Sequence, residues 1–101
     1  MEITVVWTAF AIEKLSEIYE YYLDNASVLV AERIVDEIVE KTLYLEKHST
    51  IGQLESLLSN RKKEYRYLVE GNYKIIYSKE SNFISIATVF DTRQNPQKIL
   101  K

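Results

Sequence analysis

The sequence predicts an α+β domain with the element order β-α-α-β-β-β, in which an N-terminal strand and a helical hairpin pack on a mostly antiparallel sheet. In the first half of the chain, apolar residues recur at the spacing of amphipathic helices. From residue 62 onward, short β-rich runs are separated by turn residues such as Gly71 and Asn72. Helices segregated from strands along the chain indicate two layers. The 101 residues, 47% of them hydrophobic, suffice for one core, so we expect a single domain over residues 1–101.

The N-terminal half is predicted to form a short strand and two helices. Residues 3–7 are a β-rich run, and Thr8 is placed to cap the helix that follows. A break at 24–26 ends that helix, and Ser27 is placed to cap a second helix running to about residue 47. The apolar stripes of the two helices are Ala11, Leu15, Ile18 and Tyr22, then Ala31, Ile34, Val35, Ile38, Leu43 and Leu45. Because the connection is short, the helices should form an antiparallel hairpin.

The C-terminal half is predicted to supply the sheet. After a loop at 48–53, residues 54–60 are expected to be irregular or a short strand. The elements expected next are a strand 62–69, a turn 70–72, a strand 73–78, a turn 79–82 and a strand 83–90. The tail from Asp91 is polar, and Asn95-Pro96 is suited to start a last helical turn.

Charge is unevenly distributed, although the formal net charge is only −2. Residues 1–51 hold ten acidic and four basic residues, a balance of −6. Residues 52–101 hold five acidic and nine basic residues, a balance of +4. Solvated helix faces account for the acidic residues. The clustered basic residues favour an anionic partner, either a nucleic acid or an acidic protein.

Missing residue types exclude several classes of function. Without cysteine there is no disulfide framework, thiolate zinc site or cysteine nucleophile. No phosphate loop, dinucleotide turn or metal-ligand spacing is present, so we expect no cofactor, no metal and no small-molecule substrate. His48, the only histidine, follows a helix end, where it favours a helix C-terminal cation over a catalytic base. No apolar run reaches the ~20 residues of a membrane helix. The N-terminus lacks the basic flank of a signal peptide, so we expect a cytoplasmic protein.

Arg66 is the first candidate binding residue. On a strand it shares one face with Glu64 and Leu68. Arginine in a sheet needs a carboxylate, a phosphate or water as its partner. Two interpretations follow. Arg66 either pairs with Glu55, Asp91 or Glu64 and fixes the sheet, or its planar guanidinium binds a phosphate or carboxylate of a partner.

Arg93 is the second candidate, and it either closes on Asp91 or faces a partner. Lys62 and Lys63 enter the strand that carries Arg66. Such basic residues usually solubilise an edge, but they are also placed to attract an acidic partner. Tyr65 is expected in the sheet, where packing is a more common role for tyrosine than base stacking.

Some apolar helix residues lie off the core-facing stripes. They are Ile12, Tyr19, Leu23, Val28, Leu29 and Val39. Either they pack on loops, or some of them form an exposed apolar groove, which usually marks a partner site. The sequence leaves both interpretations open.

Taken together, the motifs resemble the RelE/ParE toxin superfamily over nearly the whole chain. The matching residues are Val6-Trp7-Thr8, Ile18-x-x-Tyr21, Ala31-x-x-Ile34, Gly52, Tyr65-Arg66-x-Leu68, Tyr73-x-Ile75-x-Tyr77 and Val89-x-Asp91-x-Arg93-x-x-Pro96. Their order and spacing, rather than any one of them, carry the resemblance. The resemblance implies the fold described above and the toxin of a bacterial type II toxin–antitoxin pair. It also implies a cognate antitoxin whose C-terminal segment wraps the toxin and keeps it inactive.

The superfamily has two main activities, and the C-terminal residues bear on the choice. RelE-like members cleave mRNA on the ribosome, with arginines near the positions of Arg66 and Arg93 and usually a Tyr or His just beyond the second. Here Gln94-Asn95-Pro96 follows Arg93, so an acid/base partner is missing. ParE-like members resemble this chain in the Tyr65-Arg66-x-Leu68 strand, and they inhibit DNA gyrase by protein–protein contact.

We therefore expect a ParE-like toxin associated with plasmid stabilisation, which inhibits growth by binding DNA gyrase rather than by catalysis. The expected partner-binding residues are Arg66 and Arg93 on the sheet side, with Lys62, Lys63, Tyr65 and Asp91. The same patch is suited to receive the acidic C-terminal segment of the antitoxin. The alternatives are a ribosome-dependent mRNA endonuclease that uses Arg66 and Arg93, and an inactive toxin that only binds antitoxin.

Overall fold

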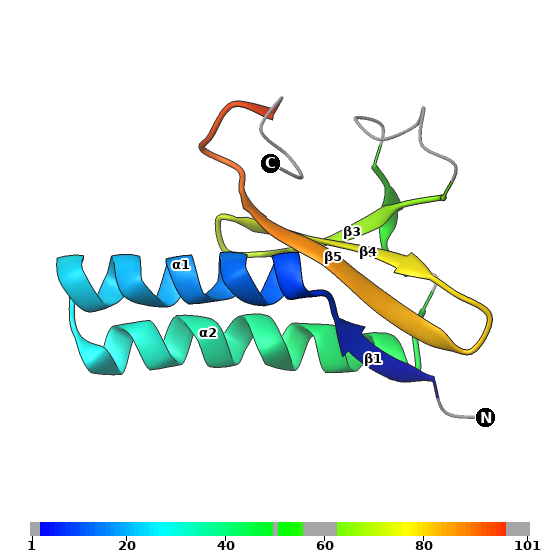
Figure 1. Cartoon of the computed structure of the whole chain (residues 1–101), viewed down its shortest axis with the longest axis horizontal. Coiled ribbons are helices and arrows are strands. Elements are labelled where there is room, and N and C mark those ends of the chain that lie inside the picture. The colour runs from blue at the N-terminus through cyan, green and yellow to red at the C-terminus, as the bar shows by residue number, and fades with distance from the viewer. Residues whose placement is uncertain (1–2, 50, 56–62, 97–101) are drawn as a thin grey trace.

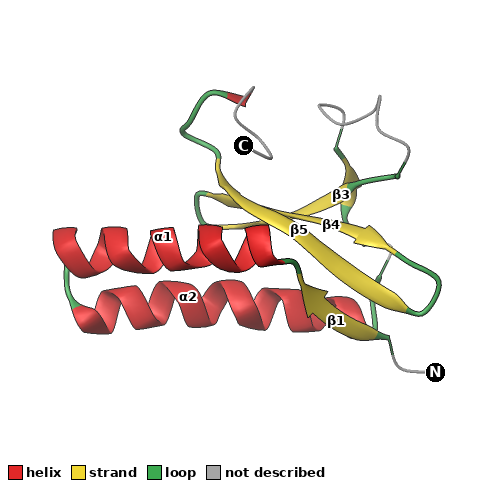
Figure 2. Ribbon diagram, viewed as in Figure 1, coloured by secondary structure: helices red, strands yellow, loops and turns green. Residues whose placement is uncertain are grey.

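The computed structural model describes residues 3–49, 51–55 and 63–96. Its elements are β1 (Thr4–Trp7), α1 (Ala9–Asn25), α2 (Val28–Leu43), the 3-10 turn η1 (Tyr44–Glu46), β2 (Gln53–Leu54), β3 (Arg66–Glu70), β4 (Tyr73–Lys79) and β5 (Phe83–Asp91). The two helices lie side by side as a hairpin, and the sheet lies against them (Figure 1). Figure 2 shows the separation of the helical and strand layers. The predicted α+β class and the predicted order of helices and strands are confirmed, with β2 as a short added strand.

Both helices start where the sequence predicts a side-chain cap. The hydroxyl oxygen of Thr8 accepts a hydrogen bond from the backbone N–H of Ala11 at 3.1 Å. The hydroxyl oxygen of Ser27 accepts one from the N–H of Val30, also at 3.1 Å. Each bond satisfies a backbone donor that has no partner within the helix, so two short polar side chains fix the N-terminal ends of α1 and α2.

The second helix is shorter than predicted. The sequence pattern extends it to about residue 47, but α2 ends at Leu43 and continues as the tighter turn η1. Thr42 contributes to this change, because its hydroxyl donates to the carbonyl of Val39 at 2.6 Å, a local bond that competes with helical geometry. The tighter turn places Leu45 in the core with no exposed surface.

The five strands form one sheet in the order β1-β5-β4-β3-β2. β1 is parallel to β5, and all other neighbours are antiparallel. The β3–β4 turn uses Gly71 at a φ of 58°, a conformation that glycine adopts without steric cost, as the sequence predicts. The strand predicted over 62–69 is β3, which spans Arg66–Glu70. The last helical turn predicted from Asn95-Pro96 would run into residues 97–101, which lie outside the described residues.

Apolar residues pack on both faces of the sheet. The larger core lies between helices and sheet, and includes Ile38, Tyr77 and the partly buried Leu68. A smaller cluster on the opposite face centres on Ile76 and Phe90, with Tyr65, Tyr67 and Ala87 against it. The alternation predicted for β3 is therefore confirmed: Leu68 faces the helices, and Tyr65 and Tyr67 face away from them.

Candidate functional site

Arg93 and Asp91 form a bidentate pair just beyond the end of β5. The guanidinium Nε donates to Asp91 Oδ1 and Nη2 donates to Oδ2, each at 2.9 Å. The backbone N–H of Arg93 adds a third bond to Oδ1 at 2.9 Å. The side-chain bonds from Arg93 lower the pKa of Asp91, and the carboxylate raises the pKa of Arg93. Because the side chain of Arg93 is 54% exposed, the pair presents an oriented guanidinium plane at the surface.

Two tyrosines place this pair against the first helix. The hydroxyl of Tyr73, opposite Asp91 in the sheet, donates to the hydroxyl oxygen of Tyr22 on α1 at 3.1 Å. Burial and this hydrogen bond raise the pKa of Tyr73 well above its usual range, so the Tyr73 hydroxyl remains a donor at neutral pH. The tyrosine contact links the start of β4, which pairs with the end of β5, to the C-terminal half of α1.

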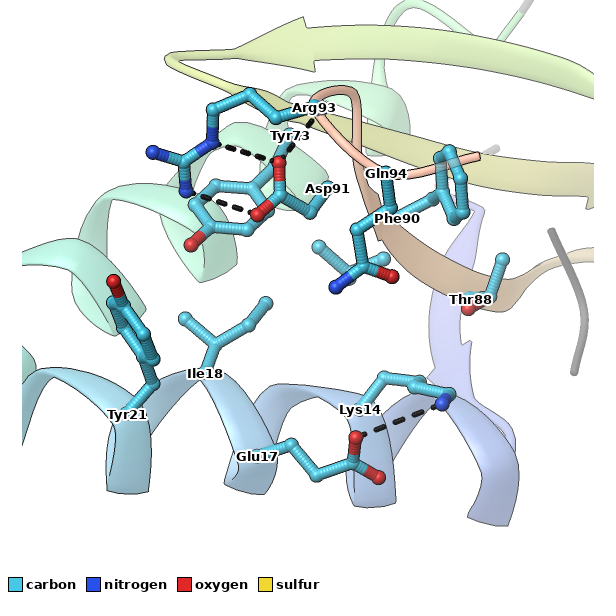
Figure 3. A pocket seen from close by; sticks show the side chains of 11 residues that line it. Lys14, Glu17, Ile18, Tyr21, Tyr73, Thr88, Phe90, Asp91, Arg93 and Gln94 are labelled. Carbon is cyan, nitrogen blue, oxygen red and sulfur yellow. Dashed lines mark hydrogen bonds and ion pairs between the residues drawn. The ribbon is translucent and has the colours of Figure 1, made fainter. Parts of the chain in front are cut away.

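A groove of about 680 Å³ lies between α1 and the end of β5. Lys14, Glu17, Ile18 and Tyr21 line it from the helix (Figure 3). The opposite wall consists of Tyr73, Thr88, Val89, Phe90, Asp91, Arg93 and Gln94. We call this hollow the α1–β5 groove. Its apolar walls and mixed charges suit a peptide or protein surface better than a small charged metabolite.

The charges inside the α1–β5 groove are already partnered. Lys14 lies 3.6 Å from Glu17, and its Nζ also lies 5.1 Å from the ring centroid of Phe10. Arg93 is held by Asp91. The groove therefore offers two ion pairs and apolar surface. Among the described residues that line it, none is a histidine, a cysteine or an unpaired carboxylate that could act as a catalytic base.

Arg66 lies elsewhere. It is opposite Tyr77 in the sheet, on the face that packs against the helices. Its Nη1 donates to the carbonyl of Gly52 at 2.8 Å, and its Nη2 lies 3.2 Å from the carboxylate of Glu64. Of the pairings that the sequence leaves open, the one with Glu64 is formed. Arg66 is built into the loop that contains Gly52, whereas Arg93 lies beyond the end of β5, and the joint partner-binding role expected for the two arginines stays a prediction.

The two arginines are also far apart along the sheet. Arg66 is paired with Tyr77 of β4, whereas Asp91, which holds Arg93, is paired with Tyr73. Four residues of strand separate these positions, a distance of about 13 Å at the usual rise per residue. In this arrangement each guanidinium is bound by acceptors of the protein itself, Gly52 and Glu64 for Arg66 and Asp91 for Arg93.

The remaining predicted site residues lie on or near the other face of the sheet. Lys63 is 3.5 Å from Glu80, and Tyr65 packs against the cluster around Ile76. Lys62 lies outside the described residues. Neither Lys63 nor Tyr65 lines the α1–β5 groove, so the predicted set of residues divides among three places on the molecule.

One ion pair on this second face escapes sequence reasoning. Lys74 Nζ lies 2.8 Å from Glu55 Oε2 and 4.3 Å from the ring centroid of Tyr67. The side chain of Glu55 is only 1% exposed. Strand alternation places Lys74 opposite the core-facing residues, but Glu55 lies in a segment without a clear period, so no local signal predicts its partner.

Among the described basic residues of the sheet half, only Lys79 has no ion pair. Lys63, Arg66, Lys74 and Arg93 each contact a carboxylate within 3.5 Å. The basic half of the sequence therefore does not form a free cationic surface in this part of the structure. Internal pairing lowers the attraction that these residues exert on phosphate.

In the chain segments that the structure describes, no cluster of three or more His, Asp or Glu side chains is arranged to hold a metal ion. Nor is any described helix long and apolar enough to cross a bilayer.

The chain was compared in sequence and in fold with known proteins. No curated protein matches the chain by sequence. A chain of the chromosomal ParDE toxin–antitoxin system from P. aeruginosa has the same fold, with a TM-score of 0.74 and 21% identity over 88% of this chain and 95% of that one. A YoeB dimer from Staphylococcus aureus matches with a TM-score of 0.53 and 22% identity over 87% and 94% of the two chains. A chain of the YoeB–YefM complex from Staphylococcus aureus matches with a TM-score of 0.52 and 18% identity over 88% and 95%.

These structural matches establish the fold, and a family model goes further. The predicted membership of the RelE/ParE superfamily, in its ParE-like branch, is confirmed by a match over residues 5–96. The model that matches describes the ParE toxin of the type II toxin–antitoxin system parDE, and this chain belongs to that family.

Proposed function

We propose that this protein is a growth-inhibiting toxin that binds DNA gyrase in the cytoplasm and is neutralised by a cognate antitoxin. Membership of the ParE toxin family supports the toxin role. One structural observation supports binding over catalysis. The two arginines available for phosphate chemistry are separated along the sheet, and each is held by acceptors of the protein itself.

A nuclease needs more than this arrangement supplies. Cleavage of RNA by the ribose 2′-hydroxyl requires stabilisation of the charge on one phosphorus centre, together with a base and a leaving-group acid. Arg66 contacts Gly52 and Glu64, and Arg93 contacts Asp91, so each guanidinium is already bound by acceptors of the protein itself. The missing Tyr or His after Arg93 agrees with this geometry.

The α1–β5 groove is the contact site that we propose. Arg93 is exposed and oriented, and it adjoins the apolar walls formed by Ile18, Val89 and Phe90. An arginine whose plane is fixed loses little side-chain freedom on binding, which is typical of interface hot spots. An antitoxin segment lying in the same groove would mask Arg93 directly, and this accounts for neutralisation without a change in fold.

Induction of the toxin gene alone in a bacterial host tests the proposal. Filamentation, an SOS response and intact ribosome-bound mRNA are expected, since a poisoned gyrase breaks DNA and leaves messages whole. Purified toxin should also inhibit supercoiling by gyrase in vitro. Cuts at codon positions in translated mRNA would instead establish the endonuclease alternative. Normal growth of cells that contain folded toxin would indicate an inactive toxin.

Substitution of Arg93 tests the proposed contact site. Arg93→Ala should retain the fold, because the side chain is exposed, and should lose growth inhibition and gyrase binding. Arg33→Ala is the matched control, since Arg33 is a similarly exposed arginine with one carboxylate partner, Glu37, on a helix surface. If both variants remain toxic at equal expression, the groove is not the gyrase contact.

A further inference from the structure

One end of the α1–β5 groove holds hydrogen-bond donors that have no acceptor among the described residues. Lys14 Nζ lies 3.6 Å from the carboxylate of Glu17, beyond hydrogen-bond range, and its other close neighbour is the ring of Phe10. The side chain of Lys14 is only 26% exposed, so much of it is shielded from solvent. The ammonium group therefore has three N–H donors and no acceptor within the described part of the chain.

Thr88 on β5 supplies a second donor at this end. The residue is 1% exposed, and its hydroxyl forms no hydrogen bond with a described residue. Every described side-chain oxygen or nitrogen that is inaccessible to solvent has a partner, so the Thr88 hydroxyl is accessible and opens into the groove that it lines. Figure 3 shows Thr88 and the Lys14 ammonium at the same end of the groove. Because buried polar side chains are normally hydrogen-bonded, the missing partner points to a ligand.

Gln94 adds an amide group from the strand side of the groove. Its backbone N–H donates to the carbonyl of Asp91 at 3.0 Å, which fixes the turn after β5. Its side-chain amide is directed into the groove (Figure 3) and has no hydrogen-bond partner among the described residues. An ammonium, a hydroxyl and an amide thus border one space. We call Lys14, Thr88 and Gln94 the donor end of the groove.

We propose that the donor end binds the carboxylate of a glutamate or aspartate side chain in the protein that the toxin inhibits. The carboxylate accepts hydrogen bonds from the Lys14 ammonium and the Thr88 hydroxyl, and such charge-assisted bonds are stronger than neutral ones. A neighbouring apolar side chain of the same segment packs on Ile18 and Val89, which line the groove. The inference rests on the proposed function, because it requires the α1–β5 groove to be the contact site for the target.

The donor end is a contact separate from the Arg93–Asp91 pair. Asp91 and Thr88 are three residues apart on β5, about 10 Å at the usual strand rise. Arg93 is already bonded to both oxygens of Asp91, whereas Lys14 makes no hydrogen bond with a described residue, so an incoming carboxylate displaces less at the donor end.

The carboxylates of the groove disfavour a nucleic acid as the occupant. Glu17 borders Lys14, and Asp91 lies at the other end of the groove. A nucleic acid carries a charge on every nucleotide, so phosphates next to the bound one would approach these carboxylates. A single acidic side chain among apolar neighbours avoids them and uses the apolar walls.

Capped peptides of about seven residues, long enough to span the groove when extended, are the direct probe. One version has a single glutamate flanked by leucines, and the matched versions have glutamine or lysine in its place. In fluorescence anisotropy the glutamate peptide should bind about tenfold more tightly than either matched peptide, and added salt should weaken it. Its amide shifts in NMR spectra should map to Lys14, Thr88 and Gln94. Equal binding of the glutamate and glutamine peptides, no binding of the glutamate peptide, or its displacement by a short single-stranded oligonucleotide would overturn the inference.

Thr88→Val separates a binding role from a structural one. The change removes a hydroxyl that has no partner in the described chain, so the urea midpoint should be unchanged or higher, while affinity for the glutamate peptide should fall about fivefold. Thr42→Val is the matched control, because Thr42 is equally buried but its hydroxyl is bonded to Val39 on α2, so peptide binding should not change. A lower midpoint for Thr88→Val with unchanged affinity would show that the hydroxyl serves the fold, and would contradict the inference.

Lys14→Gln and Glu17→Gln should act in opposite directions. Loss of the ammonium group should weaken binding of the glutamate peptide about tenfold and flatten its salt dependence. Loss of the Glu17 carboxylate should tighten binding about twofold, since a competing anion is removed. Lys41→Gln is the control, because Lys41 is on α2 and does not line the groove. Weaker binding in both Lys14→Gln and Glu17→Gln would contradict the proposed carboxylate contact.

Inhibition of gyrase by the same variants separates this inference from the proposed function. If Arg93→Ala abolishes the inhibition of supercoiling while Lys14→Gln and Thr88→Val leave it intact, only the donor-end inference is contradicted. If the toxin does not affect gyrase but binds the glutamate peptide in the way that Lys14 and Thr88 require, only the proposed gyrase target is contradicted.

Discussion

The hydroxyl of Tyr77 lies 3.0 Å from the backbone nitrogen of Gly52, from which it accepts a hydrogen bond. The same hydroxyl donates to the carbonyl of Ser49 at 3.1 Å. Arg66 closes the arrangement by donating to the carbonyl of Gly52. Residues 14 to 28 positions apart thus hold the loop after η1 on the edge of the sheet, and this accounts for the arginine better than a role at the surface does.

Gly52→Ala should destabilise the fold. A Cβ at this position would lie 2.5 Å from the Tyr77 hydroxyl and 2.8 Å from the carbonyl of Tyr67, so the packed core would have to shift. Overpacking of this kind costs about 1–3 kcal/mol. Urea unfolding measures the loss. In the Tyr77→Phe background the hydroxyl is absent, so the same substitution should cost less, and additive effects of the two changes would contradict the proposed contact.

Arg66→Ala should lower the free energy of unfolding by about 1–3 kcal/mol, because it removes a charge-assisted bond to a partly buried carbonyl. Arg66→Lys should restore little of this, since one ammonium group cannot occupy both guanidinium positions. Urea midpoints of the two variants are compared with that of Arg33→Ala, an exposed pair that should contribute almost nothing. Unchanged stability together with loss of toxicity would show instead that Arg66 contacts a partner.

Local sequence rules predicted much of the fold. The caps at Thr8 and Ser27 follow from side chains that satisfy the nearest free N–H groups, and the two faces of β3 follow from simple alternation. The parallel pairing of β1 with β5 could not be predicted in this way, because its partners are about 80 residues apart. Its register depends on how the helical hairpin packs, a property of the whole chain.

The candidate site was predicted only in part, for the same reason. Asp91 is two residues from Arg93, so their pairing is a local expectation that the structure confirms. The carbonyl of Gly52 that holds Arg66 carries no side-chain signal at all. The helix wall of the α1–β5 groove, including Tyr21, could not be assigned before the end of β5 was placed beside α1.

Stability should fall steeply in alkaline solution. Burial, followed by the bond to Tyr22, raises the pKa of Tyr73, and burial likewise raises that of Tyr77. The unfolded chain releases these protons near pH 10, whereas the folded chain retains them, so stability is complete below about pH 10 and declines above it. Each tyrosine contributes at most about 1.4 kcal/mol per pH unit.

Tyr73→Phe should reduce the decline of unfolding free energy with rising pH. The decline is measured from urea midpoints at a series of pH values between about 9 and 11. Tyr44→Phe is the control for removal of a tyrosine hydroxyl, because Tyr44 is exposed and lies outside the core. Equal slopes in the unmodified chain and in Tyr73→Phe would mean that Tyr73 is not held protonated by the fold.

Lys74→Met should be more destabilising than the double variant Lys74→Met, Glu55→Gln. In the single variant the buried carboxylate of Glu55 loses the ammonium group of Lys74, and breaking a buried pair from one side costs about 3 kcal/mol or more. Changing both partners removes the charge together with its counter-charge, so much of the loss should be recovered. A double-mutant cycle from urea unfolding gives the coupling between the two residues. Coupling near zero would mean that the 2.8 Å contact does not stabilise the second face of the sheet, and that Tyr67 and Ile76 hold it by packing alone.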